Sequence, residues 1–359
     1  MLKILKKKIA KELFLLRLTK RKGGDSLAQK RMYYNFAKLA QQRGVIWFRI
    51  ERLADEYSEF NICLAGDISE HWSFDIRHRV AKPAKDGKFF DGTDKLKLIY
   101  KPTKDWAIAV GKHSIAVGGY DYGTAPIDLY YTGQYCIDLP CFQWGANVAY
   151  TLPKGNDKFE LEVTQSPFRL MYSKKNTYGY SFRYTGNHGI INAIHSLHFF
   201  ETEPGKFLNM IVLGHQLDFG KWVIEADVLS KSSLNGNSSE LFFKNISLVG
   251  KVKYMPNEHW CISTKCAYDV NKCAANTPTS FTDYDYLVTP GTDAGRVGGI
   301  VEYYPLKGKS HNDIRIHGLA YYDIGNTTCE IGGMTDKQLY VSVGATWRLN
   351  FLNMKFKKN

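Results

Sequence analysis

Charged side chains occupy alternate positions in several stretches of this chain, with apolar residues between them. Because a strand points successive side chains to opposite faces, each stretch would gather its charges on one face. A packed core cannot hold so many ionised groups, whereas the water-filled lumen of a barrel can, and there they would act on passing ions. We predict that a lumen is lined by the basic members of this set, which are Arg77, Arg79, Lys95, Lys97, Lys251, Lys253, Lys265, Arg296, Arg315 and Arg348.

Acidic side chains share the predicted inward face. The same alternation places Asp75, Glu225, Asp227, Asp269, Glu302 and Asp323 there. Ten basic against six acidic residues predicts a mild preference for anions. Solvation, or pairing across neighbouring strands, is the alternative role for any single one of these charges.

Enzyme motifs are missing from the sequence. Gly111-Lys112 resembles part of a phosphate-binding loop, but that loop needs a glycine five residues earlier, where this chain has Trp106. Neither a GxSxG elbow nor an HExxH pair occurs. We therefore predict a protein that is not an enzyme, without catalytic residues and without a cofactor.

Cysteine and histidine give no standard metal pattern. His259, Cys261, Cys266 and Cys273 are close in sequence, but their spacing matches no zinc motif, and alternation sends Cys261 and Cys266 to opposite faces. We predict no metal site.

The chain has seven cysteines, and two of them flank a short IDLP segment. These are Cys136 and Cys141, which could form a small disulfide in an oxidising compartment. We favour two reduced thiols and leave the disulfide open.

The stretches that carry the charges have the pattern of strands. In Lys337–Phe351 the odd positions from Leu339 to Phe351 are all apolar, while the even positions from Tyr340 are mostly polar or small. Such alternation indicates strands with one apolar and one polar face. Several apolar faces begin or end on an aromatic residue, as membrane girdles require; these aromatics are Trp72, Trp106, Trp222, Tyr254, Trp260, Tyr303 and Trp347.

These signals predict an all-β fold. No run of about 18 apolar residues is present, so a membrane-spanning helix is not expected. At about 10 residues per strand plus a turn, residues 44–351 hold about 14 to 18 strands of a transmembrane antiparallel up-and-down β-barrel. A soluble antiparallel sheet with one wet face is the alternative.

Positive charge is concentrated at the N-terminus. Residues 1–43 hold 13 Lys and Arg against two acidic residues, a net +11 of the total +13, which leaves +2 for the rest. We interpret residues 1–43 as a basic helical or disordered extension and 352–359 as a short basic tail. A nearly neutral main part argues against nucleic acid as a partner. The first residues do not show the long apolar run of an export signal.

Several segments resemble the phosphate-selective porin O and P family. They are Lys97–Tyr131, Glu162–Phe168, Pro204–Gly220, Tyr268–Lys272, Pro290–Leu306 and the strand at Lys337–Phe351. The resemblance implies an outer-membrane barrel of about sixteen strands that is commonly a homotrimer and passes small solutes by diffusion. It also implies an inward constriction loop within residues 113–152, which contains Asp121, Asp128 and Asp138 but no Lys or Arg. Lys112 ends the Gly-Lys motif at the root of this loop and is a further pore-lining candidate.

The sequence thus predicts a porin in the cell outer membrane. Its predicted partners are outer-membrane lipid and small hydrophilic solutes or anions, such as phosphate. The alternative is a non-conducting barrel that acts as an adhesin, scaffold or binding protein through its surface loops.

Overall fold

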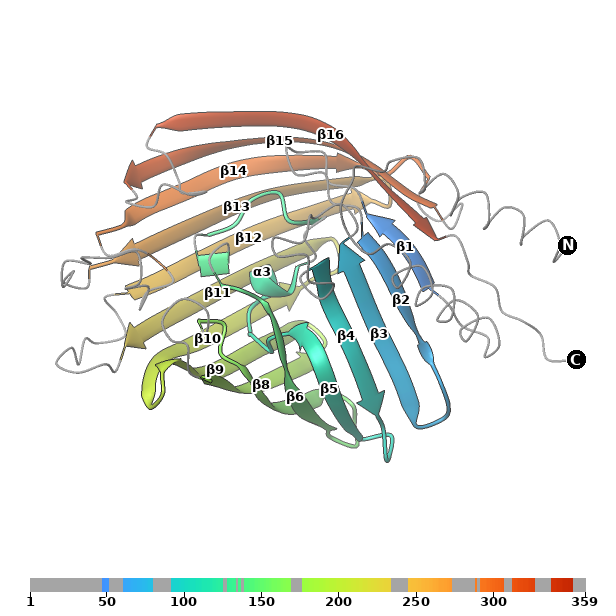
Figure 1. Ribbon diagram of the computed structural model, residues 1–359. Coiled ribbons are helices and arrows are strands. Elements are labelled where there is room, and N and C mark those ends of the chain that lie inside the picture. The colour runs from blue at the N-terminus through green and yellow to red at the C-terminus, as the bar shows by residue number, and fades with distance from the viewer. Residues whose placement is uncertain are drawn as a thin grey trace, which may run out of the picture.

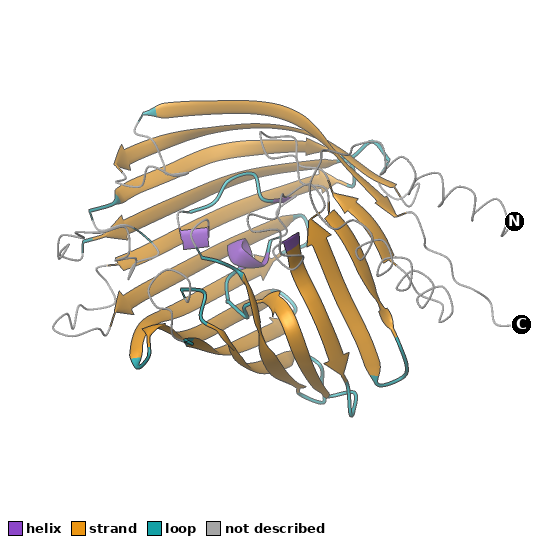
Figure 2. Ribbon diagram, in the orientation of Figure 1, coloured by secondary structure: helices purple, strands orange, loops and turns teal. Residues whose placement is uncertain are grey.

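The computed structural model describes residues 47–51, 61–79, 92–124, 128–133, 135–136, 139–168, 176–233, 245–272, 288, 291–306, 312–326 and 337–350. Within these ranges the chain is a closed barrel of sixteen strands (Figures 1 and 2). Successive strands pair antiparallel, and β1 closes the barrel on β16 through Arg49 opposite Asn350 and Ile50 opposite Leu349. The predicted all-β up-and-down barrel of about sixteen strands is confirmed.

The strands run from Trp47 to Asn350, inside the predicted range 44–351. The predictions for 1–43 and 352–359 lie outside the described residues. The strands are β1 (Trp47–Glu51), β2 (Asn61–Asp67), β3 (Trp72–Arg79), β4 (Thr93–Tyr100), β5 (Trp106–Ser114), β6 (Phe142–Thr151), β7 (Asp157–Gln165), β8 (Tyr178–His188), β9 (Ile191–Glu203), β10 (Lys206–Asp218), β11 (Trp222–Ser233), β12 (Asn245–Asn257), β13 (Trp260–Asn271), β14 (Asp293–Tyr303), β15 (Asn312–Asn326) and β16 (Gln338–Asn350).

The two rims of the barrel differ in their connections. At one rim, which we call the short-turn rim, short turns join the even-numbered strands from β2 to β12 to the strands that follow them, such as 219–221 between β10 and β11. Gly220 in that turn has a φ of 79°, a conformation that glycine adopts at little cost. At the opposite rim the chain leaves β5, and the described residues between 115 and 141 lie inside the barrel before the chain joins β6 (Figure 1).

This inward segment carries the short helix α3 (Tyr120–Gly123), and we call residues 115–141 the constriction loop. Its apolar side chains pack on the inner wall. Ile115, Val117 and Leu139 form a buried cluster with wall residues that include Phe200 and Leu208. The loop is therefore packed as part of the interior. No helix in the described ranges has the length and apolar content needed to cross a membrane.

Candidate functional site

The two faces of the wall differ in the way the alternation predicts. On β16, Leu339 and Val343 point outward and are 64% and 78% exposed. On β11, Ile224 and Val228 are exposed, while Glu225 and the buried Asp227 lie on the opposite face. Because apolar side chains face out and charged ones face in, the outer surface suits lipid and the inner surface suits water.

Tryptophan and tyrosine residues pair on the outer surface at the short-turn rim. Trp72 lies against Tyr100, with ring centroids 4.7 Å apart, at the facing ends of β3 and β4. Equivalent pairs are Trp106–Tyr150, Trp222–Tyr254 and Trp260–Tyr303. Amphipathic rings at one level of a barrel mark a lipid–water interface. The predicted aromatic ends are present at this rim, while the side chain of Trp347 lies outside the described residues.

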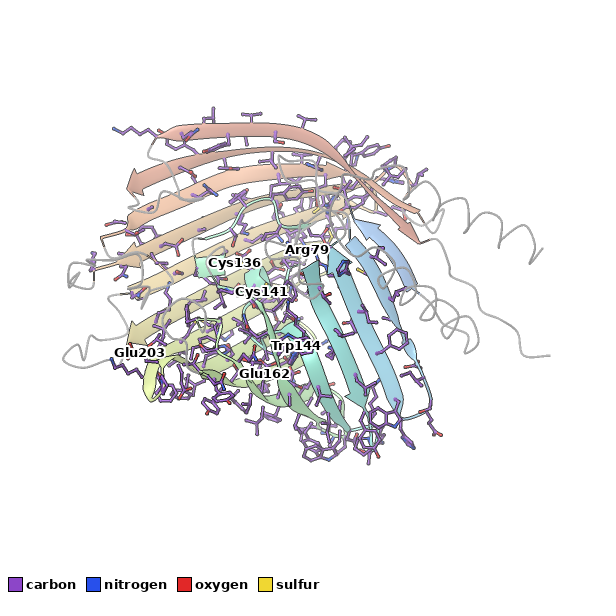
Figure 3. The ribbon with its side chains drawn as sticks, viewed as in Figure 1. Arg79, Cys136, Cys141, Trp144, Glu162 and Glu203 are labelled. Atoms are coloured by element: carbon purple, nitrogen blue, oxygen red, sulfur yellow. The ribbon has the colours of Figure 1, made fainter. Side chains whose placement is uncertain are left out.

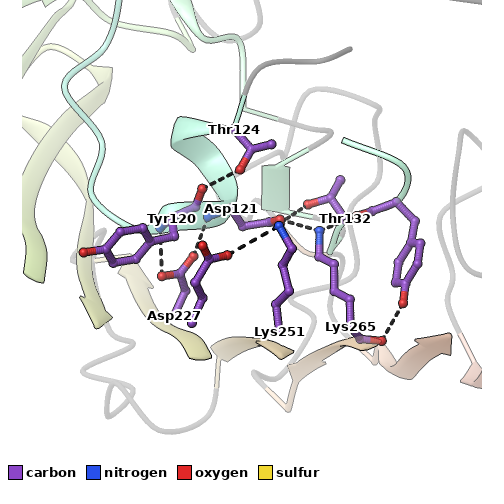
Figure 4. A network of polar contacts seen from close by, with 9 residues as sticks. Tyr120, Asp121, Thr124, Thr132, Asp227, Lys251 and Lys265 are labelled. Atoms are coloured by element: carbon purple, nitrogen blue, oxygen red, sulfur yellow. Dashed lines mark hydrogen bonds and ion pairs between the residues drawn. The ribbon is translucent and has the colours of Figure 1, made fainter. Parts of the chain in front are cut away.

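The carboxylate of Asp227 on β11 holds the helix end of the constriction loop. Its Oδ1 accepts the backbone N–H of Tyr120 at 2.9 Å, and its Oδ2 accepts that of Asp121 at 2.7 Å (Figure 4). Asp227 is 3% exposed. Gly119 precedes these two amides and has a φ of 86°. A Cβ at this position would lie only 3.0 Å from the Asp227 carboxylate, so glycine suits this close approach. The loop backbone is thus fixed to the wall by charge-assisted bonds.

Lys265 on β13 forms a second anchor. Its ammonium pairs with Asp121 and donates to the carbonyl oxygen of Tyr131, and Thr132 donates to the same carboxylate (Figure 4). The side chains of Lys265 and Asp121 are both 5% exposed. Because both side chains are buried, removal of either one would leave the other charge without its partner in a region with little water.

Arg315 on β15 forms a third anchor. Its Nη1 lies 2.7 Å from Asp128 of the loop and 3.0 Å from Glu302 of β14. Tyr130 donates its hydroxyl to Glu302 at 2.6 Å, and the Arg315 guanidinium lies over the Tyr130 ring. Burial and the bond to Glu302 raise the pKa of the Tyr130 hydroxyl well above its usual value. Three wall strands, β11, β13 and β15, therefore bind the loop at separate points.

The anchors at Lys265 and Arg315 determine the net charge of the loop aspartates. Asp121 and Asp128, predicted at the constriction, are each paired with a cation of the wall. Their negative charge is therefore largely neutralised, whereas the sequence alone identifies no cation that pairs with them. Asp138 lies outside the described residues.

Further basic candidates are also paired. Arg296 donates to both oxygens of Asp323, at 2.6 and 2.7 Å, and the Arg296 side chain is 9% exposed. Arg77 and Arg79 share the carboxylate of Asp94, at 3.3 and 2.7 Å. Arg296 and this arginine pair therefore bind wall strands to one another.

Asp94 was missed by the sequence reasoning. Strict alternation along β4 would direct it outward, since its neighbours Thr93 and Lys95 would then face in. The register between β3 and β4 shifts at Arg77 and His78, so that His78 pairs with Thr93, and Arg77 with Lys95. This bulge leaves Asp94 unpaired in the ladder and turns its carboxylate toward the two arginines. No local residue pattern signals the shift.

Four predicted pore-lining lysines remain more open to the lumen. Lys95 lies 3.6 Å from Asp75, with both side chains about one-third exposed, and Lys251 lies 3.5 Å from Glu225. Lys97 and Lys253 are partly exposed and have no ion pair with any residue in the described ranges.

Arg183 on β8, which the sequence reasoning did not select, joins these lysines on the inner wall. It pairs with Glu160, which also binds Lys158 at 3.0 Å. Its strand alternates as regularly as those selected, with Tyr180, Phe182 and Tyr184 on one face and Ser181, Arg183 and Thr185 on the other, so the same pattern could have found it.

Lys112 lies on the other side of the wall. It pairs across strands with Leu96 and with Trp144, which share the outward face of Ile108 and Val110. The prediction that Lys112 lines the pore is therefore corrected, because its even position in β5 directs it outward. Arg348 belongs to β16, but its side chain lies outside the described residues.

Cys136 and Cys141 are free thiols in the constriction loop (Figure 3). Burial raises the pKa of Cys136 to about 12 and also raises that of Cys141. Both thiols are thus held protonated at neutral pH. Among the residues described, no group of three or more His, Cys, Asp or Glu side chains is arranged to hold a metal.

Comparison with known proteins agrees with the fold. Residues 58–199 match the model of the family described as phosphate-selective porin O and P. This confirms the resemblance over that range. No curated protein sequence matches the chain.

Solved structures share the architecture. The loop L8 deletion mutant of OmpT, an outer membrane protein of Vibrio cholerae, superposes with a TM-score of 0.51 at 12% identity, covering 85% of this chain and 96% of that one. The outer membrane channel DcaP of Acinetobacter baumannii gives 0.50 at 10% identity, covering 84% and 92%. At such identities the likeness shows the fold, and the family match together with this fold supports an outer-membrane porin.

Proposed function

We propose that this chain is an outer-membrane porin through which small hydrophilic solutes diffuse, with a preference for anions. The carrying observation is the division of the inner charges into two sets. Lys265, Arg296 and Arg315 are buried and paired, so they hold the loop and wall. Lys97 and Lys253 are partly exposed without an ion-pair partner in the described ranges, and they are left to act on ions in the lumen.

The physical basis of the preference is local. A fixed ammonium beside a narrow aqueous path lowers the energy of a passing anion more than it would in open water, because the protein wall is a poor dielectric. The aspartates Asp121 and Asp128 do not offset this effect, since wall cations neutralise them. The mechanism requires no catalytic residue.

Liposome swelling tests whether solutes diffuse through the barrel. The full chain, refolded in detergent and placed in liposomes, should admit neutral sugars at rates that fall with sugar size. Swelling equal to that of empty liposomes, from a preparation whose circular dichroism shows β-structure, would contradict the porin and favour a scaffold or binding protein that works through its loops.

The homotrimer implied by the family resemblance belongs to the same proposal. Light scattering of the refolded protein in detergent should give a protein mass three times that of the chain. A mass of one chain would contradict it.

A further inference from the structure

A cavity of about 370 Å³ lies between the constriction loop and the wall formed by β11 to β15. The loop contributes Asp121, Asp128 and Tyr130, and the wall contributes Glu225, Lys251 and Lys253 among others. Its volume falls in the range of small-molecule sites, about 300–1,000 Å³. It is therefore large enough for an organic solute to pause between loop and wall.

Hydrogen-bond donors in this cavity have unused capacity. The Lys253 ammonium makes no hydrogen bond or ion pair with the residues described, and Lys251 reaches Glu225 only at 3.5 Å. An ammonium carries three donors. The two lysines are alternate residues of β12, about 7 Å apart along the strand, so their ammonium groups can meet one anionic group from two sides.

The carboxylates of the cavity set a limit on the charge of the solute. Glu225 accepts from Gln216 at 3.0 Å, and Asp128 accepts from Arg315. A carboxylate has about four acceptor positions, so Glu225 retains some for hydroxyl donors. The Glu225 carboxylate would repel a second negative charge but can accept a hydroxyl group. The Tyr130 ring, beside Leu129, adds a flat apolar surface.

We propose that this cavity is a binding site for a hydroxylated organic anion with a single negative charge, of the size of a sugar acid. The anionic group of the solute lies between Lys251 and Lys253, and a hydroxyl group of the solute donates to Glu225. This proposal rests on the proposed porin function for its biological meaning, because the site lies beside the solute path. It narrows the solute class from anions in general to organic hydroxy acids.

The test is block of the single-channel chloride current by potassium gluconate, added to one side of a planar bilayer that contains the refolded full chain. Potassium acetate supplies the charge without the hydroxyl groups, and glucose supplies the hydroxyl groups without the charge. Gluconate should half-block the current at a concentration about tenfold below that of either control, a difference that one charge-assisted hydrogen bond provides. Equal block by acetate or by glucose would overturn the proposal.

Variants locate the block. Lys253→Gln should raise the half-blocking concentration of gluconate about tenfold, because one charge-assisted contact is lost. Lys112→Gln, which removes a lysine from the outward face, should leave it unchanged. The same block in both variants would place gluconate elsewhere and overturn the assignment.

Calorimetry separates the two proposals. If the folded barrel does not conduct, the porin function fails, and titration of gluconate into the protein in detergent still tests the cavity. Heat of binding that is present in the native chain and reduced in Lys253→Gln would support the site. Absence of heat from a conducting or a non-conducting barrel would overturn it.

Discussion

At the scale of single residues, burial and partnership distinguish inner charges that residue type alone makes equivalent. Lys265 and Lys253 are both lysines on the inward face of neighbouring strands, yet Lys265 is 4% exposed and bound to Asp121, while Lys253 is partly exposed and unpaired in the described ranges. A paired, buried cation contributes little net field to the lumen, whereas an accessible one contributes most of its charge. The proposed selectivity therefore depends on fewer residues than the sequence suggests.

Lys97 offers a direct test of this division. Lys97→Glu should move the reversal potential measured under a KCl gradient toward cation preference, since it replaces an accessible positive charge with a negative one. Lys112→Glu makes the same change of charge on the outward face and should have a much smaller effect. An equal shift in both variants would show that position in the lumen does not matter.

Lys265 should behave as an anchor. Lys265→Met leaves the Asp121 carboxylate buried without its cation, and removal of one member of a buried pair costs about 3–5 kcal/mol. We expect a lower free energy of unfolding in urea together with a larger and noisier single-channel conductance as the loop loosens. Adding Asp121→Asn to Lys265→Met should recover part of the stability, as a double-mutant cycle would reveal. Unchanged conductance in Lys265→Met would argue against the anchor.

The thiol of Cys136 should react slowly. Its pKa is raised to about 12 by burial, so the reactive thiolate is scarce at pH 7.5. Relative to an ordinary thiol of pKa about 8.5, modification by N-ethylmaleimide should be slower by about a thousandfold or more. Because only the thiolate reacts and the pKa lies far above neutral, the thiolate fraction and with it the reaction rate should rise as the pH increases. Peptide mass spectrometry on native and urea-unfolded protein measures this, and equal rates in the two states would contradict the buried environment.

At the scale of elements, the strands and their faces follow from the sequence, but the connections do not. Alternation in residues 337–351 predicted the outward face of β16, and the aromatic ends of β3, β5, β11 and β13 predicted the girdle. The family resemblance implied an inward loop within residues 113–152, but the Asp94 bulge and the wall residues that this loop contacts were not predicted. The pair Lys265–Asp121 joins residues 144 positions apart, and no local pattern encodes which wall residue a loop will reach.

Gly111 tests one of these local geometries. It has a φ of 127°, and a Cβ at this position would lie 2.1 Å from the carbonyl oxygen of Leu96. Gly111→Ala should therefore lower the free energy of unfolding by more than about 1–3 kcal/mol, which is the cost of backbone strain alone. Gly318→Ala is the matched control, because a Cβ there meets nothing within 4 Å. Urea titration followed by gel mobility compares them, and equal stability of the two variants would rule out the close contact.

At the scale of the whole molecule, a basic protein encloses a lumen whose charges are close to balanced. Most of the net charge of +13 comes from residues 1–43, so it does not describe the pore. The preference for anions was predicted from a count of ten basic against six acidic side chains. The structure gives the proposed preference a different basis, because several of the ten cations are paired with carboxylates and the loop aspartates Asp121 and Asp128 are neutralised. The balance at the lumen surface thus rests on Lys95, Lys97, Lys251, Lys253 and Arg183 together with Asp75, Glu225 and Glu160.

The most direct test of the central claim is single-channel recording of the refolded full chain in a planar bilayer, with the reversal potential measured under a KCl gradient. The arrangement described predicts stepwise conductance and a reversal potential on the side of anion preference. Stepwise conductance with cation preference would contradict the role given to the accessible lysines. Absence of conductance from protein that is folded by circular dichroism would contradict the porin itself.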